Sequence, residues 1–494
     1  ADGRYVAFES EASNLVLQDT NNISDIFVYD RQDNTVERIN VPASGSKVYD
    51  SSYHPSISAD GQLVAFYSYG WNLVPNDGNG KSDVFVYNRT DDSIEMISIA
   101  NNESQGNGDS YFPSISADGL FVAFVSSATN LVSGDNNDSR DIFVYDRQAA
   151  AIERVSVTNI GVEGDNDSYY PSISADGQFV AFNSSAENFT TGDAIERSDV
   201  YVYDRQENTI ERVSVDDNGT QGYDDSYFPS ISADGQVVAF ESYAENLASK
   251  DNNELKDIFT FDRQSDTIEM VNLGYEQTQA EGESDFPSMS ADGRYIAYES
   301  WAFNLNQDET DGYWSILVYD RQEDALERVS VTNDGILGVG NSAGASISDD
   351  GRFVSFGSGV TNFDPNDTNG LWDIYLYDRL DNTIDRVSVG AGGVQEDGHS
   401  HLSSISTNGR FIVFLSEATN LVSGDDNWSD DLFLYDRVEE TLERITVNSE
   451  GIEANDDSYA SSISADGRFI AFESWATNLV PDDTNNKIGN TSAV

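Results

Sequence analysis

Residues 113–124 read Pro-Ser-Ile-Ser-Ala-Asp-Gly-Leu-Phe-Val-Ala-Phe, and near copies of this stretch recur along the chain of 494 residues. Successive copies are 58 residues apart, and no insertion breaks this spacing. A fixed period of this length indicates a repeat architecture, which overrides the estimate of about three domains from length alone. We number the repeats 1 to 9 by the middle residue of the Ala-Asp-Gly tripeptide or its variant: Asp2, Asp60, Asp118, Asp176, Asp234, Asp292, Asp350, Asn408 and Asp466.

Each full repeat holds four short runs of β-branched and aromatic residues, bounded by Gly, Asp and Asn, which predict four strands. In repeat 3 these are residues 113–116, 121–124, 141–145 and 151–157. The third run is apolar on both faces, which predicts burial between two sheets, and the fourth alternates as an outer strand would. We therefore predict an all-β fold, an eight-bladed β-propeller of four-stranded antiparallel blades. A β-solenoid is the alternative, although its coil repeat is usually much shorter.

The segment Ser464-Ala-Asp-Gly-Arg-Phe-Ile-Ala-Phe472 resembles the signature of TolB-like β-propeller repeats, which are relatives of WD-repeat propellers. The resemblance covers nearly the whole chain. It implies the propeller fold, and it implies functions as scaffolds, partner-docking modules or gates on hydrolase domains. The chain departs from the family in its longer repeat and in the lack of a companion domain, either the small N-terminal domain of TolB or a hydrolase domain.

A strand count predicts how the chain ends are used. The second strand occurs nine times, from residues 4–9 to residues 468–473, whereas the other three occur eight times. We expect residues 461–464 to complete the blade begun by residues 4–41, so that residues 1–464 form the propeller. Residues 465–494 are then a surplus strand and tail, predicted to contact a neighbouring chain. Local packing or a processing boundary is the alternative. The chain starts inside a repeat, so we also expect upstream sequence to be missing.

The composition excludes several classes of partner. Asp and Glu number 88 against 26 Lys and Arg, which gives a net charge of −62. Such a charge argues against nucleic acid and anionic membrane surfaces, and it favours cation binding or a solubility-driven surface. There is no cysteine, so disulfides and thiolate sites are excluded. No apolar run is long enough for membrane insertion.

The loop between the second and third strands carries the pattern Asp-x-Asn-x-x-x-Asp, whose oxygens could converge on calcium. Asx turns that cap the loop without metal are the alternative. Repeats 4, 6 and 9 lack parts of the pattern. The intact copies give these predicted ligands: Asp19, Asn21 and Asp25; Asp77, Asn79 and Asp83; Asp135, Asn137 and Asp141; Asp251, Asn253 and Asp257; Asp367, Asn369 and Asp373; Asp425, Asn427 and Asp431.

Two other recurring features predict structural contacts. An Asn follows the second strand in all nine repeats, as at Asn130, and we expect it to bind loop backbone while the apolar residue after it plugs the blade. An Arg follows the third strand and an acidic residue lies in the fourth, as at Arg147 and Glu153. We expect these two to pair within one hairpin at an exposed edge.

Three isolated signals carry little weight. Ser342 matches a Gly-x-Ser-x-Gly nucleophile elbow but occupies a serine position common to the repeats, so we expect no catalysis there. His399 and His401 have only one other histidine in the chain, and we interpret them as surface substitutions. Trp301 and Trp475 could stack on sugars, but loop packing is the preferred interpretation.

The uniform repeats, the surplus strand and the acidic loops together predict a non-catalytic, calcium-stabilised structural or adhesive protein that self-associates into filaments. We expect it to be secreted and to be extracellular or on the cell surface. The alternative is a carbohydrate- or protein-binding module of a secreted or periplasmic protein. No repeat-breaking cluster of acid, base and nucleophile stands out, so we predict that the chain is not an enzyme.

Overall fold

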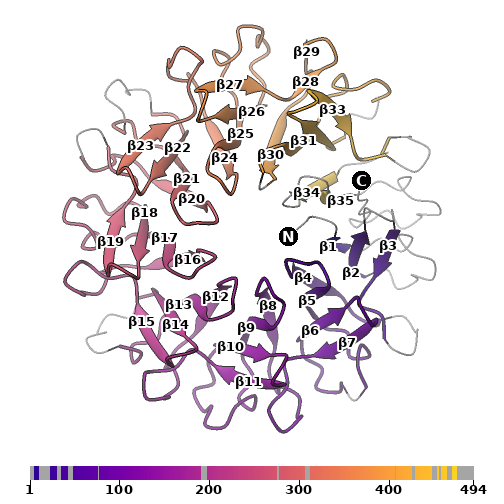
Figure 1. The fold of residues 1–494 in the computed structure, drawn as a ribbon, viewed down its shortest axis with the longest axis vertical. Coiled ribbons are helices and arrows are strands. Elements are labelled where there is room, and N and C mark those ends of the chain that lie inside the picture. The colour runs from indigo at the N-terminus through magenta and orange to yellow at the C-terminus, as the bar shows by residue number, and fades with distance from the viewer. Residues whose placement is uncertain are drawn as a thin grey trace. The chain divides into compact units, whose positions relative to one another are not determined.

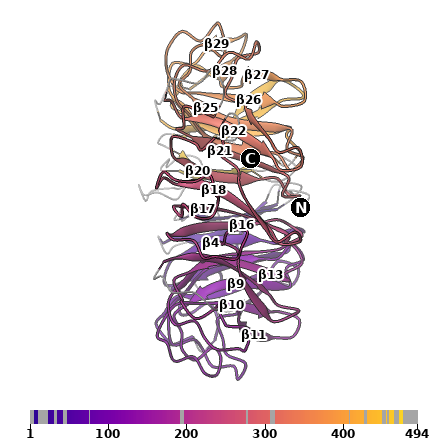
Figure 2. The ribbon, with the colours of Figure 1, turned by 90° about the vertical axis from the view of Figure 1, so that its left-hand side faces the viewer.

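The computed structural model describes residues 5–10, 23–30, 35–42, 48–75, 77–190, 197–274, 278–305, 312–406, 408–425, 429–447, 453–454, 458–463 and 470–474. Within these ranges every helix or strand assigned is a β-strand, drawn as arrows in Figures 1 and 2. The described residues contain no helix long and apolar enough to cross a bilayer.

The strands form seven complete four-stranded antiparallel sheets, and each sheet follows chain order. The first four sheets are β4 (Ser52–Ile57), β5 (Leu63–Ser68), β6 (Asp83–Asn88) and β7 (Ser93–Met96); β8 (Ser110–Ile115), β9 (Phe121–Ser126), β10 (Asp141–Asp146) and β11 (Ala151–Arg154); β12 (Ser168–Ile173), β13 (Phe179–Ser184), β14 (Asp199–Asp204) and β15 (Thr209–Arg212); β16 (Ser226–Ile231), β17 (Val237–Ser242), β18 (Asp257–Asp262) and β19 (Thr267–Met270).

The other three complete sheets are β20 (Ser284–Met289), β21 (Tyr295–Ser300), β22 (Ser315–Asp320) and β23 (Ala325–Arg328); β24 (Ser342–Ile347), β25 (Phe353–Ser358), β26 (Asp373–Asp378) and β27 (Thr383–Arg386); β30 (Ser400–Ile405), β31 (Phe411–Ser416), β32 (Asp431–Asp436) and β33 (Thr441–Arg444). A short hairpin pairs β28 (Val389–Gly390) with β29 (Val394–Gln395). The chain ends add β1 (Tyr5–Ser10), β2 (Asp25–Asp30) and β3 (Thr35–Arg38), and β34 (Ser458–Ile463) with β35 (Ile470–Ser474).

The predicted fold class is confirmed: the chain is an all-β, eight-bladed propeller of four-stranded antiparallel blades, one blade per 58-residue repeat. The chain divides into two compact parts, one formed mainly by residues 38–270 and the other mainly by residues 271–494. We call these the first part and the second part and describe each by itself. In the first part, consecutive sheets contact each other through β5 and β8, β9 and β12, and β13 and β16.

The third strand of each blade lies in the core, as its two-sided apolar pattern predicts. In β10, residues Asp141 to Tyr145 are all buried. Ile142 and Val144 pack into one hydrophobic cluster, and Phe143 and Tyr145 pack into another. Each cluster contains residues of two neighbouring sheets, so burial between sheets stabilises the stack of blades.

The Ala-Asp-Gly turn connects the first and second strands of each blade, as between β8 and β9. Asp118 accepts hydrogen bonds from the Ser116 hydroxyl at 2.6 Å and from the Leu120 N–H at 3.0 Å, which forms an Asx turn. Gly119 follows with φ 70°. A Cβ at Gly119 would lie 2.3 Å from Leu63 Cδ1 of the preceding blade, so any other residue would have to displace that side chain and also adopt the unfavourable φ.

The recurring Asn has the predicted structural role. Asn130 donates its side-chain N–H to the Gln105 carbonyl at 2.6 Å and accepts from the Asn107 N–H at 2.8 Å. Leu131, the next residue, is fully buried. The Asn therefore ties one inter-blade loop to the blade that follows it.

The recurring Arg does not pair with the acidic residue of its own hairpin, so that prediction is wrong. Arg205, which follows β14, donates to Glu153 at 2.6 Å, and Glu153 belongs to β11 of the preceding blade. The Arg205 guanidinium also donates to the Gly177 carbonyl at 2.7 Å and lies 4.1 Å above the Phe121 ring. The long arginine side chain therefore crosses to the adjacent sheet, where it finds a carboxylate, a backbone carbonyl and an aromatic ring.

We predict that Arg205→Ala lowers the free energy of unfolding by about 1–2 kcal/mol, because both a charge-assisted hydrogen bond and the cover of an aromatic ring are lost. Glu153→Ala should cost less than about 1 kcal/mol, because that carboxylate is partly exposed. Urea unfolding followed by tryptophan fluorescence checks both variants. Equal losses in the two would show that the ion pair, and not the packing of Arg205, dominates.

The C-terminal strands pair differently from the prediction. β34 pairs with β35, with Ser458 opposite Ser474, while β1, β2 and β3 form a sheet of their own. The second strand that we described as surplus therefore takes the place beside β34 that we expected residues 4–9 to take. Strands close together in the chain pair at a lower entropic cost than strands from opposite ends. Residues 475–494 lie outside the described residues, and a contact with a neighbouring chain stays a prediction.

Candidate functional site

An arginine occupies the centre of the predicted calcium loop in repeat 3. Arg154, the last residue of β11, lies 3.2 Å from Asp135, 3.1 Å from Asp141 and 3.2 Å from Glu163 through one guanidinium nitrogen. All of these groups except Glu163 are almost fully buried. A buried cation of the protein itself therefore balances the carboxylates that we predicted as metal ligands.

Repeats 7 and 8 have the same arrangement. Arg386 lies 3.3 Å from Asp373 and 4.0 Å from Asp367, and Arg444 lies 3.1 Å from Asp425 and 3.4 Å from Asp431. In repeat 1 Arg38 lies 3.2 Å from Asp25, while Asp19 and Asn21 are outside the described residues, as is Asn427 of repeat 8.

The Asn of the loop pattern faces the loop backbone. In repeat 3, Asn137 accepts the Ser139 N–H at 3.0 Å, and its side-chain N–H groups point to the Gly164 carbonyl and to Asp141. Asn369 bonds in the same way to Leu371 and Glu396. These contacts match the Asx-turn alternative, since the amide oxygen is used within the loop.

Repeats 2 and 5 lack this arginine, because Met96 and Met270 take its place. In repeat 2, Asp77 accepts from the Gln105 side chain at 3.0 Å, and Asp83 accepts from Ser98 at 2.6 Å and from Asn79 at 2.8 Å. Repeat 5 has Asp251, Asn253, Asp257 and Met270 at the equivalent positions. Neither loop has the arginine of repeat 3, so a cation from solution would suit the charge pattern of both.

Burial controls the acidity of these carboxyl groups. Desolvation raises the pKa of Asp83 to about 7 and that of Asp135 to about 6. In repeat 3 the attraction of Arg154 acts against desolvation at Asp141, whose pKa is still raised. In the part of the chain that the structure describes, no group of three or more acidic or histidine side chains is arranged to hold a metal ion. Calcium binding at the predicted ligands therefore stays a prediction.

The central arginines were missed from the sequence, although a signal was present. A basic residue stands 13 residues after the second Asp of the pattern, as Arg154 does after Asp141. It recurs at Arg38, Arg154, Arg212, Arg328, Arg386 and Arg444.

The isolated signals have structural partners. Ser342 is buried and donates to Ser358 at 2.8 Å, as the equivalent serines do in other repeats. His399 accepts the Trp372 N–H at 3.0 Å. Trp301 donates its indole N–H to the Gly312 carbonyl, which supports the loop-packing interpretation, and Trp475 is outside the described residues.

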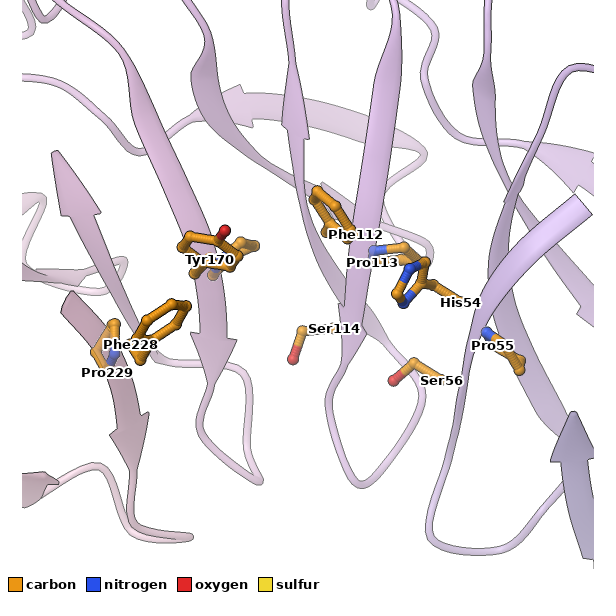
Figure 3. Close-up of a pocket in the computed structure, with 10 residues that line it drawn as sticks. His54, Pro55, Ser56, Phe112, Pro113, Ser114, Tyr170, Phe228 and Pro229 are labelled. Atoms are coloured by element: carbon orange, nitrogen blue, oxygen red, sulfur yellow. The ribbon is translucent and has the colours of Figure 1, made fainter. Parts of the chain in front are cut away.

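Four rings in the first part form a row that the sequence analysis did not single out. His54, Phe112, Tyr170 and Phe228 occupy one repeat position in β4, β8, β12 and β16 (Figure 3). Successive ring centroids are 5.0, 6.2 and 4.9 Å apart. We call these four residues the aromatic row. Tyr170 and Phe228 are 43% and 52% exposed, which is unusual for rings in contact with one another.

Each ring of the aromatic row sits on a strained backbone. The four residues have φ between 49° and 54°, a region that bulky side chains rarely adopt. The strand register shifts at the same place, so that Tyr170 and Pro171 have no partner residue on β13. The same bulge and positive φ recur at Phe286 and Leu402, so they belong to the repeat and are not particular to these four blades. Bulges of this kind often re-aim side chains near binding sites.

The aromatic row lines an open pocket of about 430 Å³ in the first part, together with prolines and the serines Ser56 and Ser114 (Figure 3). Burial lowers the pKa of His54, so its imidazole is neutral at physiological pH. The pocket therefore presents flat apolar faces with a few hydroxyl groups and no charge of its own. Such a surface suits an extended ligand that lies across several rings.

Comparisons with known proteins identify the fold. No family model and no curated protein sequence match the chain. Among solved structures, dipeptidyl peptidase 4 from Porphyromonas gingivalis is similar, with TM-score 0.55 and 14% identity, covering 96% of this chain and 63% of that one. The propeller domain of the trilobed protease from Pyrococcus furiosus (TM-score 0.40, 14% identity, 81% and 97% covered) and a putative TolB from Agrobacterium tumefaciens (0.33, 15%, 61% and 86%) are also similar.

The chain thus has a TolB-like β-propeller fold, as its repeat signature predicted. It spans about 63% of the length of the similar peptidase. The predictions of a non-catalytic structural or adhesive filament protein and of no enzymatic role are contradicted, because a dipeptidyl peptidase is among the similar structures.

Proposed function

We propose that this chain is the substrate-binding propeller of an enzyme that acts on polypeptides, and that the aromatic row binds the substrate. The observation that carries the proposal is the row itself: four exposed or half-exposed rings in contact, each held on a strained bulge. The bulge is common to the repeats, whereas the unbroken contact of aromatic side chains on four neighbouring bulges is particular to this row.

The dimensions of the aromatic row favour an extended chain. Rings 4.9 to 6.2 Å apart over four blades span the length of roughly five extended residues at ~3.3 Å each. Aromatic faces contribute large contact areas at low entropic cost, and they bind the side chains of an extended peptide without demanding one sequence. The similarity to a dipeptidyl peptidase favours a polypeptide over other polymers.

The proposal also includes a location outside the cytoplasm. A TolB-like fold is consistent with a secreted or envelope protein. The narrower prediction of a cell-surface protein belongs to the same proposal, and fractionation of the producing cells would test it.

We predict that a pool of fluorescein-labelled random dodecapeptides binds the full chain and that the double variant Tyr170→Ala/Phe228→Ala weakens binding at least tenfold. Each ring buries apolar area on binding, and truncation of aromatic anchors commonly costs 1 kcal/mol or more, about 1–2 kcal/mol per ring here. Fluorescence anisotropy measures the affinities.

The matched control is Trp71→Ala, which removes an equally exposed ring stacked on Tyr49, 4.8 Å away and outside the pocket. It should leave peptide affinity unchanged. The proposal fails if the peptides do not bind, if both variants bind as the wild type does, or if a mixture of cello- and galacturono-oligosaccharides binds the row instead.

A further inference from the structure

The aromatic row carries no charge, but the turns on one side of it are acidic. Each strand of the row runs from its ring past a pocket residue, such as Ser56 or Ser114, to an Ala-Asp-Gly turn. In Figure 3 these two serines lie on the same side of the rings, which is therefore the side of the turns. The middle residues of the four turns are all exposed, and we call them the acidic turns: Asp60, Asp118, Asp176 and Asp234.

The acidic turns are close enough to the aromatic row to influence a ligand that lies on it. Ser114 lines the pocket, and Ser116, two residues further along the chain, donates its hydroxyl to Asp118 at 2.6 Å. Two strand residues span about 7 Å. The Asp118 carboxylate is thus on the order of 10 Å or less from the pocket, about the Debye length at 0.1 M salt. The long stem of a lysine or arginine side chain covers most of that distance.

The charge of the acidic turns is not neutralised by neighbouring bases. In the part of the chain that the structure describes, no ion pair involves these four residues. Arg147 does reach one turn, where it donates to the Gly119 carbonyl at 3.2 Å, but it is already paired with Glu95 at 2.6 Å.

The second part differs at the equivalent turns. There an arginine follows the turn glycine, and Arg294 pairs with Asp320 at 2.7 Å, as Arg352 does with Asp378 at 2.6 Å. The first part has no base at this position, which is held by Gln62, Leu120, Gln178 and Gln236. The turns beside the aromatic row therefore keep negative charge that the second part balances with arginine.

We infer that the polypeptide bound by the aromatic row is basic, with lysine or arginine side chains directed toward the acidic turns. The net charge of −62 attracts a cationic chain at long range, and the acidic turns favour it at the row itself. The faces of the rings also accept a lysine or arginine cation. This inference rests on the proposed function, and it names the class of polypeptide that the row binds.

The test uses the full chain and fluorescein-labelled dodecapeptides of one apolar sequence, in which four alternating positions hold Lys, Gln or Glu. At low salt the Lys peptide should bind at least tenfold more tightly than the Gln peptide, and the Glu peptide should bind most weakly. Added salt should weaken the binding of the Lys peptide and leave that of the Gln peptide almost unchanged, because salt screens only the charged contacts.

A double variant, Asp118→Asn/Asp176→Asn, locates the preference at the turns. Asparagine preserves the turn, since Asn408 of repeat 8 accepts the Ser406 hydroxyl and the Arg410 N–H, both at 2.9 Å. Removal of two carboxylates about 7–10 Å from the peptide cations should reduce the preference for Lys over Gln about threefold.

The matched control is Asp92→Asn/Asp266→Asn, which removes the same charge from the tips of the hairpins between β6 and β7 and between β18 and β19. Both residues are exposed and have φ near 54°, and Asn208 occupies the same repeat position with φ 54°. This control should leave the preference almost unchanged. Thermal melts report whether both double variants fold.

The outcomes separate this inference from the proposed function. Equal binding of the Lys and Gln peptides overturns the basic preference and leaves the aromatic row in place. So does a preference that falls equally in the two folded double variants, or in neither, because the acidic turns would then not be its source. Failure of every peptide to bind, or undiminished binding of the Lys peptide to Tyr170→Ala/Phe228→Ala, overturns both.

Discussion

Arg154→Met is expected to lower the free energy of unfolding by about 3–5 kcal/mol, the cost of leaving buried carboxylates without their cation. Arg154 is 8% exposed and contacts three carboxylates, of which Asp135 and Asp141 are themselves buried. Methionine fits sterically, because Met96 occupies the same position in repeat 2. Urea unfolding at pH 7 measures the loss.

The matched control for this prediction is Arg140→Met, in the same repeat. Arg140 lies 3.4 Å from Asp167, but both side chains are about one-third exposed or more, so this pair should contribute less than about 1 kcal/mol. If Arg154→Met were no more damaging than Arg140→Met, the guanidinium would not be the counter-ion of the buried loop.

Met96→Arg combined with Gln105→Glu is expected to stabilise the protein by about 1–3 kcal/mol at pH 8, because it copies the Arg154 and Glu163 arrangement of repeat 3 into repeat 2. Burial raises the pKa of Asp83 from 3.8 to about 7. A carboxyl group with a raised folded pKa favours folding fully below pH 3.8, and this contribution is lost as the pH rises through about 7. The inserted arginine lowers that pKa, so the gain should be large at pH 8 and small near pH 4.

The same variant tests the remaining calcium prediction. If calcium binds in repeat 2, it should raise the melting temperature of the wild type relative to chelator, and the rise should shrink when an arginine occupies the site. Urea unfolding at pH 4 and pH 8 and thermal melts with calcium or chelator provide the data. A gain in the free energy of unfolding that does not change with pH would contradict its electrostatic origin. An equal rise in melting temperature with calcium in both proteins would show that any calcium binds outside the repeat 2 loop.

The fold could be predicted because the residues within each repeat specify its turns and strands through local contacts. Asp118 and Gly119 specify the turn, and the apolar pattern of residues 141–145 specifies a buried strand, so one repeat was enough to interpret all of them. Contacts between repeats were harder to predict. The pairing of Arg205 with the preceding blade depends on how far a long side chain reaches, which residue spacing alone does not show.

The candidate site was hidden from the sequence for a related reason. Phe112, Tyr170 and Phe228 look like ordinary strand residues, and a regular strand would point them into a core. The bulge turns them outward, and its signal is limited to the following proline, as in Tyr170-Pro171. The spacing of Asp and Asn in the acidic loops fits both calcium ligands and Asx turns. Only the position of Arg154 in the structure distinguishes a metal site from a loop that the protein's own arginine neutralises.

The most direct test of substrate binding is a crystal structure of the full chain with the tightest-binding peptide from the anisotropy measurements. We predict density for an extended peptide across Phe112, Tyr170 and Phe228. A peptide bound at another surface, with the four rings left uncovered, would contradict the role of the aromatic row.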